Sequence, residues 1–223
     1  MIRAAIFDVD GTLLDSMPIW ENAAAIYLKK RGIEAEAGLG RKLYSMSMQE
    51  GAAYLQEQYG VPLPASAIIE GVGAVVSEFY LREAPLKPHV KSFLSGLKEK
   101  GIPMAVATSN ERPAVEAAFR RLALSEYFVE IFTCSEIGAG KTQPEIFLRA
   151  ADTLRAEPRC TWVFEDAFYA ARTARAAGFR VAGVYDASGE EDIERLKEQS
   201  DLYLATFSGF EDFYQKAQQE EFL

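Results

Sequence analysis

The sequence has a single histidine, His89, among its 223 residues. That count excludes a histidine-rich zinc site and a metal-binding helix with two histidines. A Ser-His-Asp triad would have to use His89, but this residue follows Pro88 where a helix is expected to begin, and the G-x-S-x-G elbow is absent. We therefore expect His89 to begin a helix rather than to act as a base.

Cysteine is almost as scarce. Cys134 and Cys160 form no metal-binding or redox spacing, and we expect both to be reduced thiols in the core. Long apolar runs are also lacking, and no stretch approaches the length of a membrane-spanning helix. Asp8 and Asp10 interrupt the apolar stretch near the N-terminus, so no secretory signal is expected. A cytoplasmic location follows as the expectation.

Positively charged residues are fewer than negatively charged ones: the sequence has 24 Lys and Arg residues and 33 Asp and Glu residues, which gives a net charge of −9. This balance disfavours nucleic acid or an anionic membrane as the main partner. It does not exclude a small anionic substrate, because a metal and a few local cations can reverse the sign inside one cleft. No obligate protein partner is evident, and the length suits one large domain or a core with a small insert.

The first strand of the chain ends in two acids. Residues 4–7 are apolar on both faces, which is typical of a central parallel strand covered by helices. Asp8 and Asp10 follow two residues apart, so near the strand end they point roughly the same way. Open α/β sheets bind ligands at this end. A divalent metal is the simplest relief of the repulsion between two acids, although both could also belong to an ordinary loop.

A block of helices interrupts the α/β pattern. Apolar spacing predicts helices over residues 17–31, 47–59 and 65–81, and no strand pattern occurs between Ser16 and Arg82. From Pro85 onward strands alternate with helices of about ten residues, which indicates right-handed βαβ units on a parallel sheet. The predicted strands cover residues 103–108, 130–134, 161–165, 181–185 and 202–205. The predicted helices between and after them cover residues 90–100, 113–122, 144–154, 167–177, 190–199 and 210–219.

This order predicts an α/β fold in two parts. A Rossmann-like parallel sheet forms the core from residues 1–14 and 83–223, and a helical bundle is inserted over residues 15–82. Polar residues follow several strands of the core and should meet at one sheet edge: Asp8, Asp10, Thr108, Ser109, Asn110, Gly140, Lys141, Glu165 and Asp166. Carboxylates, hydroxyls and one ammonium are thereby expected together.

This set of side chains suits phosphoryl transfer, which needs a nucleophile, charge neutralisation and positioning. Asp8 could be the nucleophile and form an aspartyl-phosphate. Asp10 could act as acid on the leaving oxygen and then as base on water. Asp8 and Asp166 offer hard oxygen ligands for Mg²⁺. Thr108 and Ser109 could hold phosphate oxygens near a helix start, with Lys141 as the fixed positive charge; these roles make the edge a candidate active site.

Each of these residues also has an ordinary interpretation. Thr108 and Asn110 are common helix-capping types, and Asp166 could be an N-cap. Lys141 by itself would be a solvated lysine. Only the joint pattern favours a site.

Four motifs, in order, resemble those of the haloacid dehalogenase superfamily. Within it they are similar to phosphatases and phosphomutases that carry an α-helical cap after the first strand. The motifs are the run from Asp8 to Ser16, the strand-end Thr108, the stretch Gly140-Lys141-x-x-Pro144-Glu145-Ile146-Phe147, and Phe164-Glu165-Asp166 before a helix that ends Ala176-Ala177-Gly178. The match spans nearly the whole chain.

The resemblance assigns roles to the matching residues. It implies that Asp8 is the nucleophile and Asp10 the acid and base. It implies that Mg²⁺ is held by the Asp8 side chain, the Asp10 carbonyl and Asp166, with Glu165 nearby through water. It implies that Thr108 and Lys141 grip the phosphate. The presence of Asp10 as a second acid also argues against the dehalogenase branch of the family, whose members do not need to protonate a leaving alkoxide.

The sequence departs from the family pattern at several positions. Ala167 and Ala170 stand where the family often has Ser and Gly, which affects fine positioning. β-Phosphoglucomutases carry a His and an Arg in the cap, where this chain has Trp20 and Met48. A mutase must keep its aspartyl-phosphate from water, so hydrolysis is the expected outcome here.

The expected function is a Mg²⁺-dependent phosphatase for a small phosphorylated metabolite, with a sugar phosphate as the favoured class. A phosphomutase of the β-phosphoglucomutase type is the alternative, and a catalytically idle phosphate-binding module is less favoured. The cap would close over the substrate and set specificity. Trp20, Tyr44 and Met46 could line its pocket face, although Trp20 could equally be a core residue of the cap.

Overall fold

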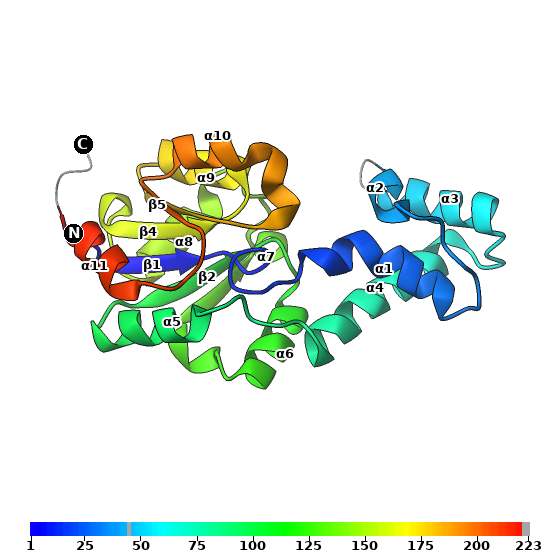
Figure 1. The fold of residues 1–223 in the computed structure, drawn as a ribbon, viewed down its shortest axis with the longest axis horizontal. Coiled ribbons are helices and arrows are strands. Elements are labelled where there is room, and N and C mark those ends of the chain that lie inside the picture. Colours follow the sequence, from blue (N-terminus) through cyan, green and yellow to red (C-terminus); the bar gives the residue numbers. More distant parts are fainter. Residues whose placement is uncertain (44–45, 220–223) are drawn as a thin grey trace. The chain divides into compact units, whose positions relative to one another are not determined.

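A computed structural model describes residues 1–43 and 46–219 (Figure 1). The chain forms two compact units, of which one comprises Met1–Asp15 and Pro85–Leu223 and the other Ser16–Ala84. Tyr44, proposed above as a pocket residue, lies outside the described residues.

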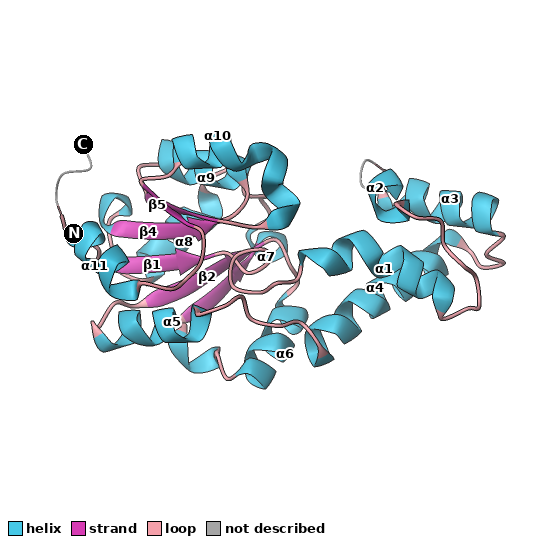
Figure 2. Ribbon diagram, in the orientation of Figure 1, coloured by secondary structure: helices cyan, strands magenta, loops and turns pink. Residues whose placement is uncertain are grey.

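The first unit contains a parallel sheet of six strands in the order β3-β2-β1-β4-β5-β6 (Figure 2). The predicted α/β fold with a parallel, Rossmann-like sheet is thereby confirmed. The strands are β1 Ala4–Phe7, β2 Met104–Thr108, β3 Glu130–Thr133, β4 Thr161–Glu165, β5 Arg180–Val184 and β6 Leu202–Leu204. Their bounds differ from the predicted ones by one residue at most.

Helices lie between the strands of this unit along the chain, and one follows the last strand. They are α5 Val90–Glu99, α6 Arg112–Leu122, α7 Cys134–Ile137, α8 Glu145–Thr153, α9 Phe168–Ala176, α10 Ile193–Gln199 and α11 Phe210–Gln218. The prediction missed α7 because four residues are too few to show a helical period. It also began the helix of residues 190–199 too early, because Ala187–Asp192 forms a 3₁₀ segment with a kink at Gly189.

The core explains why β1 is apolar on both faces. Ala4 and Ile6 belong to a buried cluster that includes residues of α8 and α9. Phe7 instead stacks on Phe164 of β4, with ring centroids 4.2 Å apart, and Phe164 in turn contacts Phe93 of α5. Alternate side chains of one strand therefore pack against two helical layers, which is why the strand is apolar on both faces.

The scarce residues lie mostly as predicted. His89 is the N-cap of α5, with a φ of 67°, so its place at a helix start is confirmed. Cys134 and Cys160 are free thiols, but both are only half-buried. Cys134, which begins the short α7, packs against the buried core cluster, so the prediction of a core thiol holds for it in part. Cys160 ends a 3₁₀ turn before β4.

In the second unit the regular elements of the described residues are all helices. Its helices are α1 Met17–Lys29, α2 Leu39–Leu43, α3 Met48–Tyr59 and α4 Ala65–Arg82. A capping box begins α3, where the Glu50 N–H donates to Ser47 Oγ at 3.2 Å and the Ser47 N–H donates to the Glu50 carboxylate at 2.7 Å. Trp20 is 44% exposed, so the interpretation of Trp20 as a core residue of this unit is wrong. Met48 is exposed as well, and Met46 is half-buried.

No helix within residues 1–43 and 46–219 combines the length and the apolar character needed to cross a membrane.

Candidate active site

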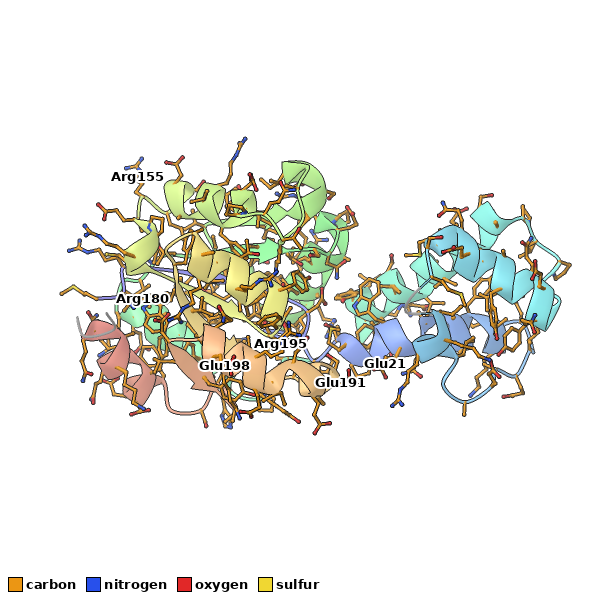
Figure 3. All side chains as sticks on the ribbon, turned by 90° about the horizontal axis from the view of Figure 1, so that it is seen from above. Glu21, Arg155, Arg180, Glu191, Arg195 and Glu198 are labelled. Carbon is orange, nitrogen blue, oxygen red and sulfur yellow. The ribbon has the colours of Figure 1, made fainter. Side chains whose placement is uncertain are left out.

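The parallel strands bring distant residues to one edge of the sheet. Arg180, which begins β5, lies at one end of the unit, and Glu191, which follows β5, lies at the other (Figure 3). Glu191 thus marks the edge of the sheet at which the strands have their carboxyl ends. In the sheet, β1 lies between β2 and β4. Asp8, which follows β1, and Thr108 and Glu165, which end β2 and β4, are all buried. The edge therefore gathers polar side chains from three neighbouring strands.

Lys141 lies at the centre of this edge. Its ammonium, on the turn between α7 and α8, donates to Asp8 Oδ1 and, at 2.8 Å, to Glu165 Oε2. The residue is only 3% exposed, so the interpretation of Lys141 as a solvated lysine is wrong. Burial alone would lower the pKa of Lys141, but the carboxylates of Asp8 and Glu165 more than offset it and raise the pKa above its ordinary value. The site thus contains a buried lysine that is paired with two carboxylates.

Three carboxylates crowd around this cation. Oxygen atoms of Asp8, Glu165 and Asp166 all lie within 4.8 Å of one another. Burial, followed by the charge of Asp8, raises the pKa of Asp166 to about 8 and that of Glu165 well above its ordinary value. In the described chain the buried Asp8 Oδ2 has no hydrogen-bond partner. Excess negative charge and a buried oxygen without a partner fit a hard divalent cation such as Mg²⁺.

The loop after β1 approaches Asp166 closely. The Thr12 hydroxyl donates to Asp166 Oδ1 at 3.0 Å. Gly11 has a φ of +81°, and a Cβ at this position would lie 2.3 Å from Asp166 Oδ2. Only glycine suits both the backbone conformation and this approach. The N-cap of α9 is Ala167, so the interpretation of Asp166 as an N-cap is wrong.

Asp10 lies beside the end of β2 rather than within the three-carboxylate cluster. The side-chain amide of Asn110 donates from Nδ2 to Asp10 Oδ2 at 3.1 Å. Asp10 is half-buried, whereas Asp8 is almost fully buried. The two acids of the first motif therefore occupy different surroundings, as two different chemical roles would require.

The polar residues after β2 form a compact turn. The Thr108 hydroxyl accepts a 3.0 Å hydrogen bond from the Asn110 N–H, and the Ser109 hydroxyl lies 3.6 Å from Cys134 Sγ. Within the described residues, neither hydroxyl bonds to a carboxylate of the cluster. The N-cap of α6 is Glu111 and makes no side-chain capping bond, so the interpretation of Thr108 and Asn110 as helix caps is wrong.

Sequence reasoning missed an ion pair behind the site. Lys87 donates to the carbonyls of Gly11 and Tyr185 and, at 2.8 Å, to the carboxylate of Asp186. Both charged side chains are largely buried. The pair ties the loop after β1 to the end of β5. Asp186 follows β5 as the other polar residues follow their strands, and that placement could have revealed it.

Comparisons with known proteins agree with this architecture. A protein-family model described as "Hydrolase: haloacid dehalogenase-like hydrolase" matches residues 2–178. A phosphorylated carbohydrates phosphatase of Thermotoga maritima is 28% identical over 184 residues, which cover 82% of this chain and 85% of that protein. A fructose-1-phosphate phosphatase of Escherichia coli is 30% identical over 182 residues, which cover 80% of this chain and 94% of that protein.

Solved structures are similar as well. A candidate β-phosphoglucomutase of Thermotoga maritima superimposes with a TM-score of 0.85 at 25% identity, covering 96% of this chain and 99% of that one. The family match covers well over half of the chain and includes all four motifs. It confirms both the resemblance found in the motifs and the prediction of a hydrolytic enzyme. The chain belongs to the haloacid dehalogenase-like hydrolase family.

Proposed function

We propose that this protein is a Mg²⁺-dependent phosphatase that hydrolyses a small phosphorylated metabolite through an aspartyl-phosphate on Asp8. The observation that carries the proposal is the buried Asp8 carboxylate, which Lys141 holds by Oδ1 while Oδ2 has no hydrogen-bond partner in the described chain. A carboxylate with one oxygen held by a cation and the other without a hydrogen-bond partner suits nucleophilic attack. The similar phosphatases named for carbohydrate phosphates support a sugar phosphate as the substrate class.

The proposed reaction has two steps. A carboxylate oxygen of Asp8 attacks phosphorus, the bond from phosphorus to the leaving oxygen breaks, and Asp10 gives that oxygen its proton. Asp10 then takes a proton from water, which attacks the aspartyl-phosphate and frees Asp8 and inorganic phosphate. Lys141 holds Asp8 and offsets the charge on the phosphoryl oxygens, with Thr108 and Ser109 as further phosphate-binding groups.

We assign the Mg²⁺ site to the Asp8 side chain, the Asp10 carbonyl and Asp166, with Glu165 nearby. When bound, the ion neutralises phosphoryl charge and polarises the phosphoryl group. We also propose that the helical residues 15–82 act as the specificity cap. The cytoplasmic location and the lack of an obligate protein partner stay predictions.

Mg²⁺ is expected to stabilise the protein, and more strongly at about pH 8 than at about pH 5. The pKa of Asp166 is about 8 in the folded protein against an ordinary 3.8, so the folded state binds this proton more tightly than the unfolded state. The stability of the metal-free protein therefore falls as the pH rises between these values, and a bound cation opposes the fall. Thermal unfolding with Mg²⁺ or EDTA at both pH values measures this. Asp166→Asn should remove most of the shift, and an unchanged shift in that variant would contradict the assigned site.

A panel of phosphate esters tests the activity itself. In the presence of Mg²⁺ the wild type should release inorganic phosphate from at least one sugar phosphate, and Asp8→Asn should not. The proposal fails if the wild type hydrolyses no ester or if the variant keeps the full rate.

The alternative function is a phosphomutase, which the similarity to a candidate β-phosphoglucomutase favours. Trp20 and Met48 argue against it, because they occupy the positions where those mutases carry a His and an Arg. With β-glucose 1-phosphate and a bisphosphate primer we expect phosphate release. Conversion to glucose 6-phosphate without net phosphate release would reverse this ranking.

A further inference from the structure

Asn110 connects the loops after two neighbouring strands. It is 8% exposed and makes three hydrogen bonds. Its backbone N–H donates to Thr108 Oγ1 at 3.0 Å, and its side-chain Oδ1 accepts from the Glu111 N–H at 2.8 Å. Its Nδ2 donates to Asp10 Oδ2 at 3.1 Å. The side chain thus spans from the turn after β2 to the loop after β1.

Chemistry fixes which end of the Asn110 amide faces Asp10. A backbone N–H can only donate, so the group beside the Glu111 N–H must be the side-chain oxygen. The NH₂ group is then the end that faces Asp10. Asn110 therefore always presents a donor to Asp10.

We propose that Asn110 is a positioning residue for Asp10, an inference that rests on the proposed function. The Asn110 amide holds Asp10 by Oδ2 and thereby sets the orientation of the carboxyl group that gives the leaving oxygen its proton. Because the donor is neutral, it can bond to Asp10 both as carboxylate and as carboxylic acid. A lysine or arginine at this position would favour the carboxylate alone.

A purely structural role for Asn110 predicts a different result. Its bonds to Thr108 and Glu111 shape the turn before α6, and losing them would disturb binding of every substrate alike. Losing the donor to Asp10 should instead slow the reaction only for substrates whose leaving group must be protonated. Asn110→Asp separates the two roles, because it keeps an oxygen for the Glu111 N–H but replaces the N–H donor beside Asp10 with a carboxyl oxygen. Asn110→Ala removes both.

The experiment compares two substrates in the two variants at about pH 8. One substrate is 4-nitrophenyl phosphate, whose phenolate leaves without a proton, and the other is the sugar phosphate with the highest wild-type rate in the ester panel. The ratio kcat/KM is used because it reports only the steps up to loss of the leaving group. We expect both variants to lose about 100-fold on the sugar phosphate. On 4-nitrophenyl phosphate the loss should stay below about fivefold, since acid catalysis contributes little there.

Equal losses on the two substrates, or no loss in either variant, would overturn the inference. A normal rate for Asn110→Asp on the sugar phosphate would overturn it as well. Asp8→Asn runs alongside as the test of the proposed function. If Asp8→Asn stays active, the covalent mechanism itself fails, whereas uniform losses at Asn110 with an inactive Asp8→Asn refute only the positioning role.

Discussion

The Asp8→Asn variant is expected to remain folded and to release phosphate more slowly than the wild type by a factor of roughly 10⁴ or more. An amide has almost the shape of a carboxylate but is not a nucleophile toward phosphorus. The lost activity would therefore reflect chemistry rather than packing. Phosphate release from the best ester of the panel measures it.

The stability of Asp8→Asn should match or exceed that of the wild type in metal-free buffer. The charge of Asp8 contributes to the raised pKa values of both Glu165 and Asp166, so a neutral side chain relieves repulsion in the cluster. Lys141 keeps its 2.8 Å bond to Glu165 and can donate to the new amide oxygen. Thermal unfolding in EDTA checks this expectation.

A matched control lies in the same loop. Asp15 is exposed, so Asp15→Asn removes one negative charge of the same kind outside the buried cluster. It should leave both the phosphatase rate and the unfolding temperature near those of the wild type. A near-normal rate in Asp8→Asn, or an unfolding temperature several degrees below the wild type, would contradict the account of the site.

The sheet could be predicted from the sequence because burial on two faces leaves an unbroken apolar run. β1, β2 and β4 are buried along their whole length, and each is followed along the chain by a segment of helical period. The acids at the strand ends could also be predicted, since they interrupt those runs at their carboxyl ends. Segments without a period escaped prediction, as the four residues of α7 and the five of α2 illustrate.

The contacts within the site could not be predicted, because they join residues that local patterns do not connect. Asn110 is a common capping type, but its side chain bonds to Asp10, 100 residues away in the sequence. Lys141 lies 133 residues from Asp8, and nothing in its surrounding sequence indicates that it is buried. Local rules taken one residue at a time place Lys141 in solvent and Asn110 at a helix end. The order of the strands predicts that both reach one sheet edge, but only tertiary packing decides which side chains pair there.

Lys141→Met should cost both activity and stability, in contrast to Asp8→Asn. Methionine has a similar length and opens no large cavity, but it leaves the carboxylates of Asp8 and Glu165 buried without their cation. Breaking a buried ion pair from one side costs about 3–5 kcal/mol. For a chain of this size that lowers the unfolding temperature by roughly 10 °C. The rate should fall by about 10³-fold, because a preorganised charge at the phosphoryl group is lost.

Two measurements separate charge from packing in Lys141→Met. Burial raises the pKa of Glu165, and without the Lys141 cation its carboxyl binds a proton still more tightly in the folded state than in the unfolded state, so the destabilisation should shrink as the pH falls from about 8 to about 5. Adding Glu165→Gln should recover part of the lost stability, because one uncompensated buried charge disappears, while the activity stays low. If the double variant is as unstable as Lys141→Met at every pH, the lysine acts through packing, and the electrostatic account of this site is wrong.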